Sequence, residues 1–355
     1  MRLGIIGLPQ TGKTTLFNAL TRGTQPTGAS GKIEVHTAVV DVPDERVDRL
    51  NEMFKPKKKT YTKVTYADIA GLDGSAGKTG IAGTLLNQLT QMDGFIQVVR
   101  CFENDNVAHI HGSVDAQRDL GIMESEFLLN DLIAVERKLE RLAEERKKGG
   151  SRDKALVERD IELFTRFHEA LQNDTPLRDL EVSAEEEKAL SGFGFLSRKP
   201  MLVVLNLSEG QSAPKIDYAH RNVQIVDLQA RLEMDIAQLP PEEAAVFLEE
   251  YGISEPSLNR MIRLSYDLLG LMSFLTAGED EVRAWTVRRG ATAPEAAGEI
   301  HSDLQKGFIR AEVVAYDDLI ALGGLTEAKA KGKLRLEGKE YIVKDGDILN
   351  IRFNL

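Results

Sequence analysis

Eight residues near the N-terminus have the types and the spacing of a phosphate-binding loop. The run Gly7-Leu8-Pro9-Gln10-Thr11-Gly12-Lys13-Thr14 fits the pattern G-x-x-x-x-G-K-[ST], and its glycines allow backbone N–H groups to converge on an anion. Lys13 would reach the β- and γ-phosphates, and the Thr14 hydroxyl would ligate Mg²⁺. The pattern predicts a nucleoside triphosphate site, and a glycine-rich turn without a ligand is the alternative. Besides Lys13, the expected phosphate contacts are the backbone amides of Gln10, Thr11, Gly12, Thr14 and Thr15.

A carboxylate at the end of a second predicted strand fits the part of such a site that binds the metal ion. Residues 61–68 are rich in β-branched and aromatic residues and predict a strand, which leads into Asp68-Ile69-Ala70-Gly71. This run fits the D-x-x-G pattern of P-loop GTPases. In that pattern the carboxylate, here Asp68, holds Mg²⁺ through water, and the glycine N–H, here Gly71, contacts the γ-phosphate. A strand that simply ends in a turn is the alternative. Leu72 stands where Ras-like proteins carry a glutamine that orients water, so we expect slow hydrolysis or another way of positioning water.

A third strand ends in residues that would face the base. Asn206-Leu207-Ser208-Glu209 follows the apolar run 201–205 and occupies the place of Asn-Lys-x-Asp in guanine-specific proteins. There the aspartate accepts hydrogen bonds from guanine N1–H and the exocyclic amine. Glu209 is longer by one methylene, and Leu207 lacks the lysine stem that covers the base, so we predict that ATP is accepted at least as well as GTP. In the alternative, Asn206 and Glu209 only cap the following turn.

Alternating strand and helix patterns position these residues. Strands at 3–6, 61–68, 94–102 and 201–206, with a helix from Thr15, predict an α/β fold with a doubly wound, mostly parallel sheet. Ligands of such sheets lie at the carboxyl ends of the strands. Between residues 116 and 199, apolar residues at 4-3 spacing on two segments predict an inserted coiled-coil hairpin with basic residues at its tip.

The last part of the chain has a different pattern. Strands are expected at 284–287, 333–336, 340–343 and 348–353, with a short helix at 293–300. A small mixed sheet crossed by one helix is the β-grasp arrangement. We therefore expect three parts, which are a P-loop domain formed by 1–115 and 200–274, a helical insertion at 116–199, and a β-grasp domain at 275–355.

Composition limits the partners and the compartment. The net charge of −11 over 355 residues argues against a surface that coats nucleic acid, so RNA contact needs local basic patches such as the lysine run 55–59 or the hairpin tip. A solvated charged face is the alternative for both. Cys101 is the single cysteine, which excludes an intramolecular disulfide and fits a cytoplasmic protein. No apolar run approaches the roughly 18 residues of a membrane span. Mg²⁺ is the only metal expected, and no DNA sequence specificity is expected.

Several strings resemble the YchF family of Obg-like ATPases over nearly the whole length. Beyond the three patterns above, they lie at 100–106, 274–285, 307–313 and 337–347. The resemblance implies that the β-grasp domain is a TGS domain, that ATP is hydrolysed in preference to GTP, and that the protein binds ribosomes, with rRNA of the large subunit as the expected partner. It also implies that Leu72 replaces the catalytic glutamine and that His109 matches a loop histidine proposed to assist hydrolysis. A solvent-exposed loop histidine is the alternative, and His111 is a close neighbour.

Three positions depart from the family pattern. The phosphate loop of the family usually carries an asparagine where this chain has Gln10, which leaves dependence on K⁺ open. The first switch usually has a threonine where Lys32 stands, so closure over Mg²⁺ by that hydroxyl is absent or falls to another residue. The usual Ser-Ala turn near the base is replaced by Gln229 and Ala230, so base recognition there is expected to differ in detail.

Two other functions fit the same residues. One is a GTP-specific switch in which Glu209 substitutes for aspartate. The other is a scaffold that binds nucleotide with little hydrolysis, as Leu72 and Lys32 would allow. Side-by-side binding of ATP and GTP, together with hydrolysis measured with and without ribosomes, separates these functions from an ATPase. The oligomeric state is left open.

Overall fold

The computed structural model describes residues 1–26, 35–69, 72, 80–81, 83–148, 152–190, 192–250 and 255–354. Tertiary packing divides the chain into two compact units. The first unit comprises Met1–Ala38 and Thr65–Leu258, and the second comprises Val39–Val64 and Asn259–Leu355. This division differs from the boundaries expected from the sequence, because residues 39–64 and 259–274 pack with the C-terminal part of the chain.

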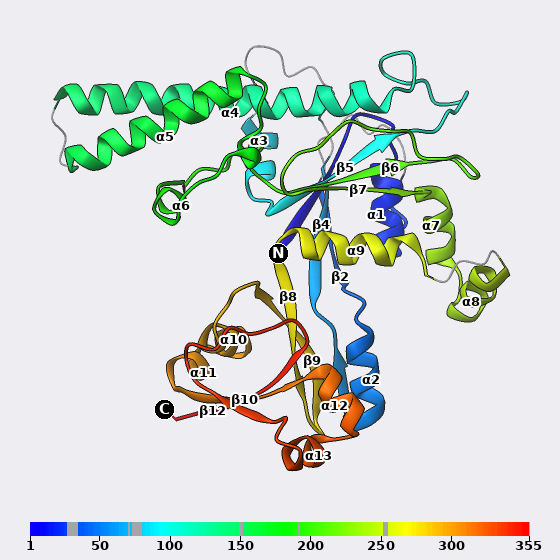
Figure 1. Ribbon diagram of the computed structural model, residues 1–355. Helices are drawn as coiled ribbons and strands as arrows, with labels where there is room; N and C mark the ends of the chain where they lie inside the picture. Colours follow the sequence, from blue (N-terminus) through cyan, green and yellow to red (C-terminus); the bar gives the residue numbers. More distant parts are fainter. Residues whose placement is uncertain are drawn as a thin grey trace. The chain divides into compact units, whose positions relative to one another are not determined.

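The first unit is built on a six-stranded sheet with the order β2-β4-β1-β5-β6-β7 (Figure 1). The strands are β1 (Arg2–Ile6), β2 (Val35–Asp41), β4 (Lys63–Ile69), β5 (Gly94–Arg100), β6 (Met201–Asn206) and β7 (Val223–Leu228). Each pairing from β4 through β1, β5 and β6 to β7 is parallel. Every residue of β5 and β6 is buried, as expected for the centre of a parallel sheet covered on both faces. The predicted doubly wound sheet is confirmed.

Helices cover this sheet and form the insertion. They are α1 (Lys13–Thr21), α3 (Gly83–Thr90), α4 (Ala116–Lys148), α5 (Lys154–Gln172), the 3₁₀ turn Leu177–Asp179, α6 (Ala184–Leu190), α7 (Ala230–Gln238) and α8 (Pro241–Glu250). Helices α4 and α5 run side by side (Figure 1), joined by apolar contacts that include Leu128, Val135, Leu142, Val157 and Phe164. The apolar residues at 4-3 spacing therefore face each other inside the predicted helical hairpin.

The second unit is a mixed sheet with the order β11-β10-β12-β8-β9-β3. Its strands are β3 (Lys58–Thr60), β8 (Leu271–Ala277), β9 (Glu281–Arg288), β10 (Phe308–Ala315), β11 (Arg335–Glu337) and β12 (Asp347–Phe353). The helices of this part are α2 (Glu45–Phe54), α10 (Ala293–Ile300), α11 (Ser302–Lys306), α12 (Tyr316–Leu322) and α13 (Leu325–Ala330), and α9 (Ser257–Leu268) enters it. The strand expected at 340–343 is wrong, because that segment makes only the isolated bridge between Ile342 and Thr292.

Helix α2 belongs to the core of the second unit. Its Val47 and Leu50 are fully buried in an apolar cluster with Leu275, Val282 and Leu319. A segment from the first fifth of the sequence thus completes the C-terminal fold. Within the described residues, no helix is long and apolar enough to cross a membrane.

Candidate nucleotide-binding site

The carboxyl ends of the first unit's strands bring the predicted site residues to one edge of the sheet. In the strand register Asp68 of β4 lies beside Ile5 of β1, just before the phosphate loop, and Asn206 of β6 pairs with Arg100 of β5 and Leu228 of β7. This edge is where parallel α/β sheets bind their ligands.

Two glycines allow the phosphate loop its tight path. Gly7 has a φ of 144°, and a Cβ there would lie 2.4 Å from the carbonyl oxygen of Val98. Gly12 has a φ of 95°, and a Cβ there would lie 2.4 Å from Nδ2 of Asn206. Gln10 also has a positive φ, 62°. Gly12 is the N-cap of α1, and no side chain caps the first turn, so the loop leads into a helix start suited to an anion.

Lys13 places its ammonium group inside this loop. Its Nζ donates hydrogen bonds to the carbonyl oxygens of Gly7 at 2.9 Å and Leu8 at 2.7 Å. Burial lowers the pKa of Lys13 to about 8, although the negative charge of Asp68 opposes this shift. The free loop therefore holds a desolvated cation that a phosphate group would stabilise.

Thr14 and Asp68 form the pair that was predicted to hold the metal. The Thr14 hydroxyl donates to Oδ2 of Asp68 at 2.8 Å. Burial raises the pKa of Asp68, while the Thr14 hydrogen bond and the positive charges of Lys13 and His36 oppose the rise. A hydroxyl and a carboxylate are hard oxygen donors of the kind Mg²⁺ prefers. Two protein ligands also suit an ion that keeps several waters and binds phosphate oxygens.

Asn206 connects the phosphate loop to the start of α7. Its Nδ2 donates to the carbonyl oxygen of Thr11 at 2.9 Å, and its Oδ1 accepts from the backbone N–H of Ala230 at 3.0 Å. The alternative in which Asn206 only caps the following turn is therefore wrong. Leu207 is buried in the apolar core and Glu209 is exposed.

Gln229, one residue before α7, carries a buried Oε1 with no donor partner among the described residues. An unsatisfied buried acceptor is costly, so this oxygen is a candidate for a hydrogen bond from a ligand.

Leu72 lies in the protein core. It is 3% exposed and shares an apolar cluster with Leu8 of the phosphate loop and with Ala116 and Leu120 of α4. Its side chain is therefore packed in the apolar core. Gly71, which was expected to contact the γ-phosphate, and Lys32 lie outside the described residues, as does most of the glycine-rich segment after Leu72.

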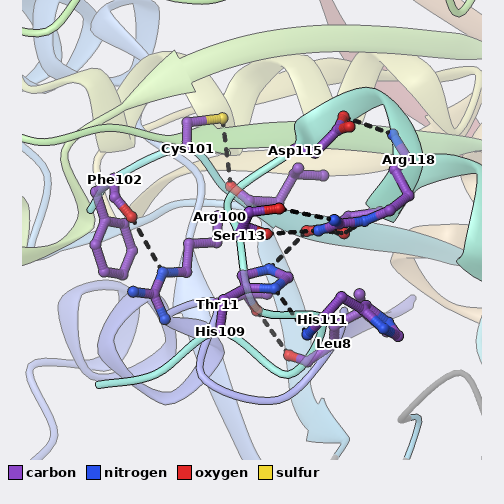
Figure 2. A network of polar contacts seen from close by, with 12 residues as sticks. Leu8, Thr11, Arg100, Cys101, Phe102, His109, His111, Ser113, Asp115 and Arg118 are labelled. Atoms are coloured by element: carbon purple, nitrogen blue, oxygen red, sulfur yellow. Dashed lines mark hydrogen bonds and ion pairs between the residues drawn. The ribbon is translucent and has the colours of Figure 1, made fainter. Parts of the chain in front are cut away.

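His109 is buried beside the start of α4 (Figure 2). Its Nε2 lies 2.8 Å from Oδ2 of Asp119, and its Nδ1 accepts the backbone N–H of His111 at 3.1 Å. The alternative of a solvent-exposed loop histidine is therefore wrong. Asp119 could not be singled out from the sequence, because one acidic residue in the first turn of a helix is a common N-terminal feature.

The basic patches expected from the sequence are largely paired with acidic residues. In the second unit, Lys57 pairs with Asp280, Lys58 with Glu281 and Lys59 with Asp48, at 2.7, 3.1 and 2.7 Å. At the hairpin tip, the ion pairs are Arg146–Glu158, Lys148–Glu144, Arg152–Glu145 and Arg152–Asp160. Neither patch is a simple cluster of uncompensated positive charge.

The glycine-rich loop after β1 supplies hydrogen-bond donors for an anion. Next to it, the Thr14 hydroxyl and the carboxylate of Asp68, at the end of β4, supply oxygen ligands for a divalent cation. This is the arrangement of the P-loop nucleotide-binding proteins, and the protein is of that class.

Comparison with known proteins narrows the class to one family. Residues 2–130 match the family described as 50S ribosome-binding GTPase, and residues 271–354 match the YchF-GTPase C-terminal family, described as a protein of unknown function. The ribosome-binding ATPase YchF of Bacillus subtilis is 42% identical over 99% of both chains, and that of Escherichia coli O157:H7 is 42% identical over 100% of this chain and 99% of its own. The solved structure of the Schizosaccharomyces pombe YchF GTPase is similar with a TM-score of 0.84 and 30% identity, covering 99% of this chain and 97% of its own. The chain belongs to the YchF family.

Proposed function

We propose that the protein binds Mg²⁺·ATP in the loop after β1, hydrolyses it slowly, and acts on the ribosome as a nucleotide-dependent switch. The observation that carries this proposal is Lys13, a buried ammonium group held at 2.9 and 2.7 Å by carbonyl oxygens of the same loop. On binding, Lys13 moves from these carbonyls to the β- and γ-phosphates, and the amides of residues 10–15 surround the phosphates. The relatives named ribosome-binding ATPases support both the reaction and the partner.

Thr14, through its hydroxyl, and Asp68, through its carboxylate, would hold Mg²⁺, which would neutralise charge on the phosphates. The K⁺ dependence of related GTPases is not part of this proposal, because Gln10 replaces their asparagine. Leu72 contributes no hydrogen-bond donor or acceptor, so the intrinsic rate of ATP hydrolysis is low. His109 is the residue that orients the attacking water.

ATP is preferred to GTP because the residues near the base lack the guanine-specific pattern. Glu209 is exposed and Leu207 is packed in the core, so neither supplies the aspartate or the lysine stem of that pattern. Ala230 keeps Asn206 in position through its backbone N–H.

Three measurements test the function. Calorimetric titrations with Mg²⁺·ATP and Mg²⁺·GTP should give tighter binding of ATP; a tenfold preference for GTP would instead establish a GTP-specific switch.

Single-turnover hydrolysis of ATP should be slow for the protein alone and faster when ribosomes are added. No turnover in either condition would instead indicate a nucleotide-binding scaffold. Co-sedimentation with ribosomes across the nucleotide-free, ADP, ATP and analogue-bound states should show that binding depends on the nucleotide.

A further inference from the structure

His109 is held at both of its ring nitrogens. Nδ1 accepts the backbone N–H of His111 at 3.1 Å, so the ring proton is on Nε2, which donates to Asp119 at 2.8 Å. The side chains of His109 and Asp119 are each only 3% exposed. A group that takes a proton from water needs a free lone pair within hydrogen-bond reach of that water. In this arrangement both ring nitrogens of His109 are occupied, and neither offers a lone pair to water.

Asp119 is itself fixed in place. Its second oxygen, Oδ1, accepts two hydrogen bonds from Arg118, from Nε at 3.0 Å and from Nη2 at 2.8 Å. Arg118 also donates to the carbonyl oxygen of Ser113 at 2.7 Å (Figure 2). Both carboxylate oxygens of Asp119 are thus used as acceptors, one for the histidine and one for the arginine.

The loop that carries His109 is anchored at its other end. Arg100, at the end of β5, donates from Nε to the carbonyl oxygen of Phe102 at 3.1 Å and from Nη2 to that of Val107 at 2.8 Å. These bonds hold the residues before His109 to the sheet. These two bonds do not involve His109, so opening its contacts with Asp119 and His111 would not require breaking them.

Asp119 lies in the first turn of α4, the long helix that forms one side of the helical hairpin. The same turns contribute Ala116 and Leu120 to the apolar cluster that contains Leu8 of the phosphate loop and Leu72. The start of α4 therefore contacts the histidine by a hydrogen bond and shares packing with two residues of the nucleotide site. A displacement of α4 would change both.

We propose that Asp119 is a positioning residue that restrains His109, so that the start of the hairpin helix α4 keeps hydrolysis slow until the His109–Asp119 hydrogen bond opens. The proposal rests on the proposed function, in which His109 assists hydrolysis. It adds that the restraint is built into the helical insertion, which can transmit a force applied to the hairpin into the nucleotide site.

The first test is Asp119→Asn. Asparagine is neutral and has one acceptor oxygen, so the charge-assisted bond to the His109 Nε2–H is lost in either orientation: a neutral carbonyl oxygen replaces the carboxylate, or the amino group faces the histidine. Single-turnover hydrolysis of saturating Mg²⁺·ATP without ribosomes should rise about tenfold, the factor expected for losing one charge-assisted hydrogen bond, while the Kd for ATP is unchanged. In Asp119→Asn combined with His109→Ala the rise should disappear, since the released group is absent.

The matched control is Asp115→Asn. Asp115 is exposed, four residues earlier in the chain, and its carboxylate accepts the Arg118 backbone N–H at 3.0 Å; within the described part of the chain it makes no hydrogen bond or ion pair with His109. Asparagine caps a helix as well as aspartate, so this variant should match the unmodified protein. A rate for Asp119→Asn that equals or falls below that of Asp115→Asn contradicts the restraint and assigns Asp119 a structural or orienting role.

A chemical label reads the same contact directly. Diethyl pyrocarbonate acylates unprotonated imidazoles that solvent can reach, and mass spectrometry separates His109 from the exposed His111. His109 should react more slowly than His111 in the unmodified protein, with or without a non-hydrolysable ATP analogue, and faster in Asp119→Asn. Equal reactivity of His109 in the unmodified protein and in Asp119→Asn contradicts the restraint. If the unmodified protein binds ATP but never hydrolyses it, the proposed function fails in its own assay, while the label still reports whether His109 is held.

Discussion

At the scale of single residues, Lys13 has the most perturbed environment of the proposed chemistry. A charged ammonium group in a buried loop has lost most of its hydration, and two carbonyl oxygens replace only part of it. This burial brings the pKa of Lys13 from 10.5 down to about 8. Between about pH 8 and 10.5, Lys13 of the folded, nucleotide-free protein is therefore mostly neutral, whereas the unfolded chain still keeps the proton.

Nucleotide binding should take up this proton above pH 8. Phosphate oxygens next to the ammonium group favour its charged form, so bound Lys13 is protonated where free Lys13 is not. Titrations with Mg²⁺·ATP in two buffers of different ionisation enthalpy should show uptake of about one proton at pH 9 and almost none at pH 7, with affinity falling as the pH rises above 8. The variant Lys13→Arg, which stays charged, should show no uptake at either pH. Identical uptake at pH 7 and pH 9 would mean that free Lys13 is already fully charged.

Residue types and spacing were enough to predict which polar residues lie at the ends of the parallel strands, but the contacts of these residues could not be predicted. The strand-end positions of Asp68 and Asn206 follow from local patterns, because parallel strands end at one edge. The bond from Asn206 to Thr11 joins residues 195 positions apart, and no local pattern encodes it. The same holds for the burial of His109 against Asp119, which depends on how the loop folds back onto α4.

At the scale of elements, the helical hairpin must be joined to the sheet where the chain returns toward β6. Asp131 of α4 makes this connection. It is fully buried, and its carboxylate accepts the backbone N–H of Leu196 at 2.9 Å, the backbone N–H of Ser197 at 2.7 Å and the Ser197 hydroxyl at 2.7 Å. One side chain thus satisfies three donors of a segment 65 residues away in sequence.

Removing this carboxylate should destabilise the first unit. Asp131→Ala leaves three buried donors without their acceptor, and we expect a loss of about 3–5 kcal/mol in the free energy of unfolding. The control is Glu140→Ala, on the exposed face of the same helix, for which a change within about 0.5 kcal/mol is expected. Urea denaturation followed by circular dichroism measures both. Equal midpoints for the two variants would show that the return segment is held by its apolar contacts alone.

Helices with a clear repeat of apolar residues were predicted well, whereas strands, which form only beside a neighbouring strand, were predicted less well. The hairpin helices show their apolar residues at 4-3 spacing over many turns. By contrast, β8 and β10 were not anticipated, and residues 340–343 look like a strand from their β-branched and aromatic content yet lack a neighbour to pair with beyond one bridge. Strand formation depends on a partner, which a single segment does not reveal.

At the scale of the whole molecule, the chain passes between its two units three times, after residues 38, 64 and 258. Strands β2 and β4 each contribute residues to both units, and β4 carries Asp68 into the nucleotide site. No local pattern in residues 39–64 marks a passage into another unit, which is why these residues were placed with the nucleotide-binding part. Their assignment to the second unit follows from the apolar side chains of α2.

This arrangement predicts that a substitution early in the chain weakens the C-terminal fold. Leu50 of α2 is completely buried with Leu275 and Val282, so Leu50→Ala should cost about 2–5 kcal/mol through lost contacts and the cavity left behind. Hydrogen exchange should rise in β8, β9 and β12, while β1 and β5 of the first unit keep their protection. Arg49→Ala, at a neighbouring side chain that is 63% exposed, is the control and should leave exchange unchanged. If Leu50→Ala instead increased exchange in β1 and β5, helix α2 would belong energetically to the nucleotide-binding unit. The three chain crossings would then lie inside one cooperative fold, and domain boundaries could not be inferred from packing alone.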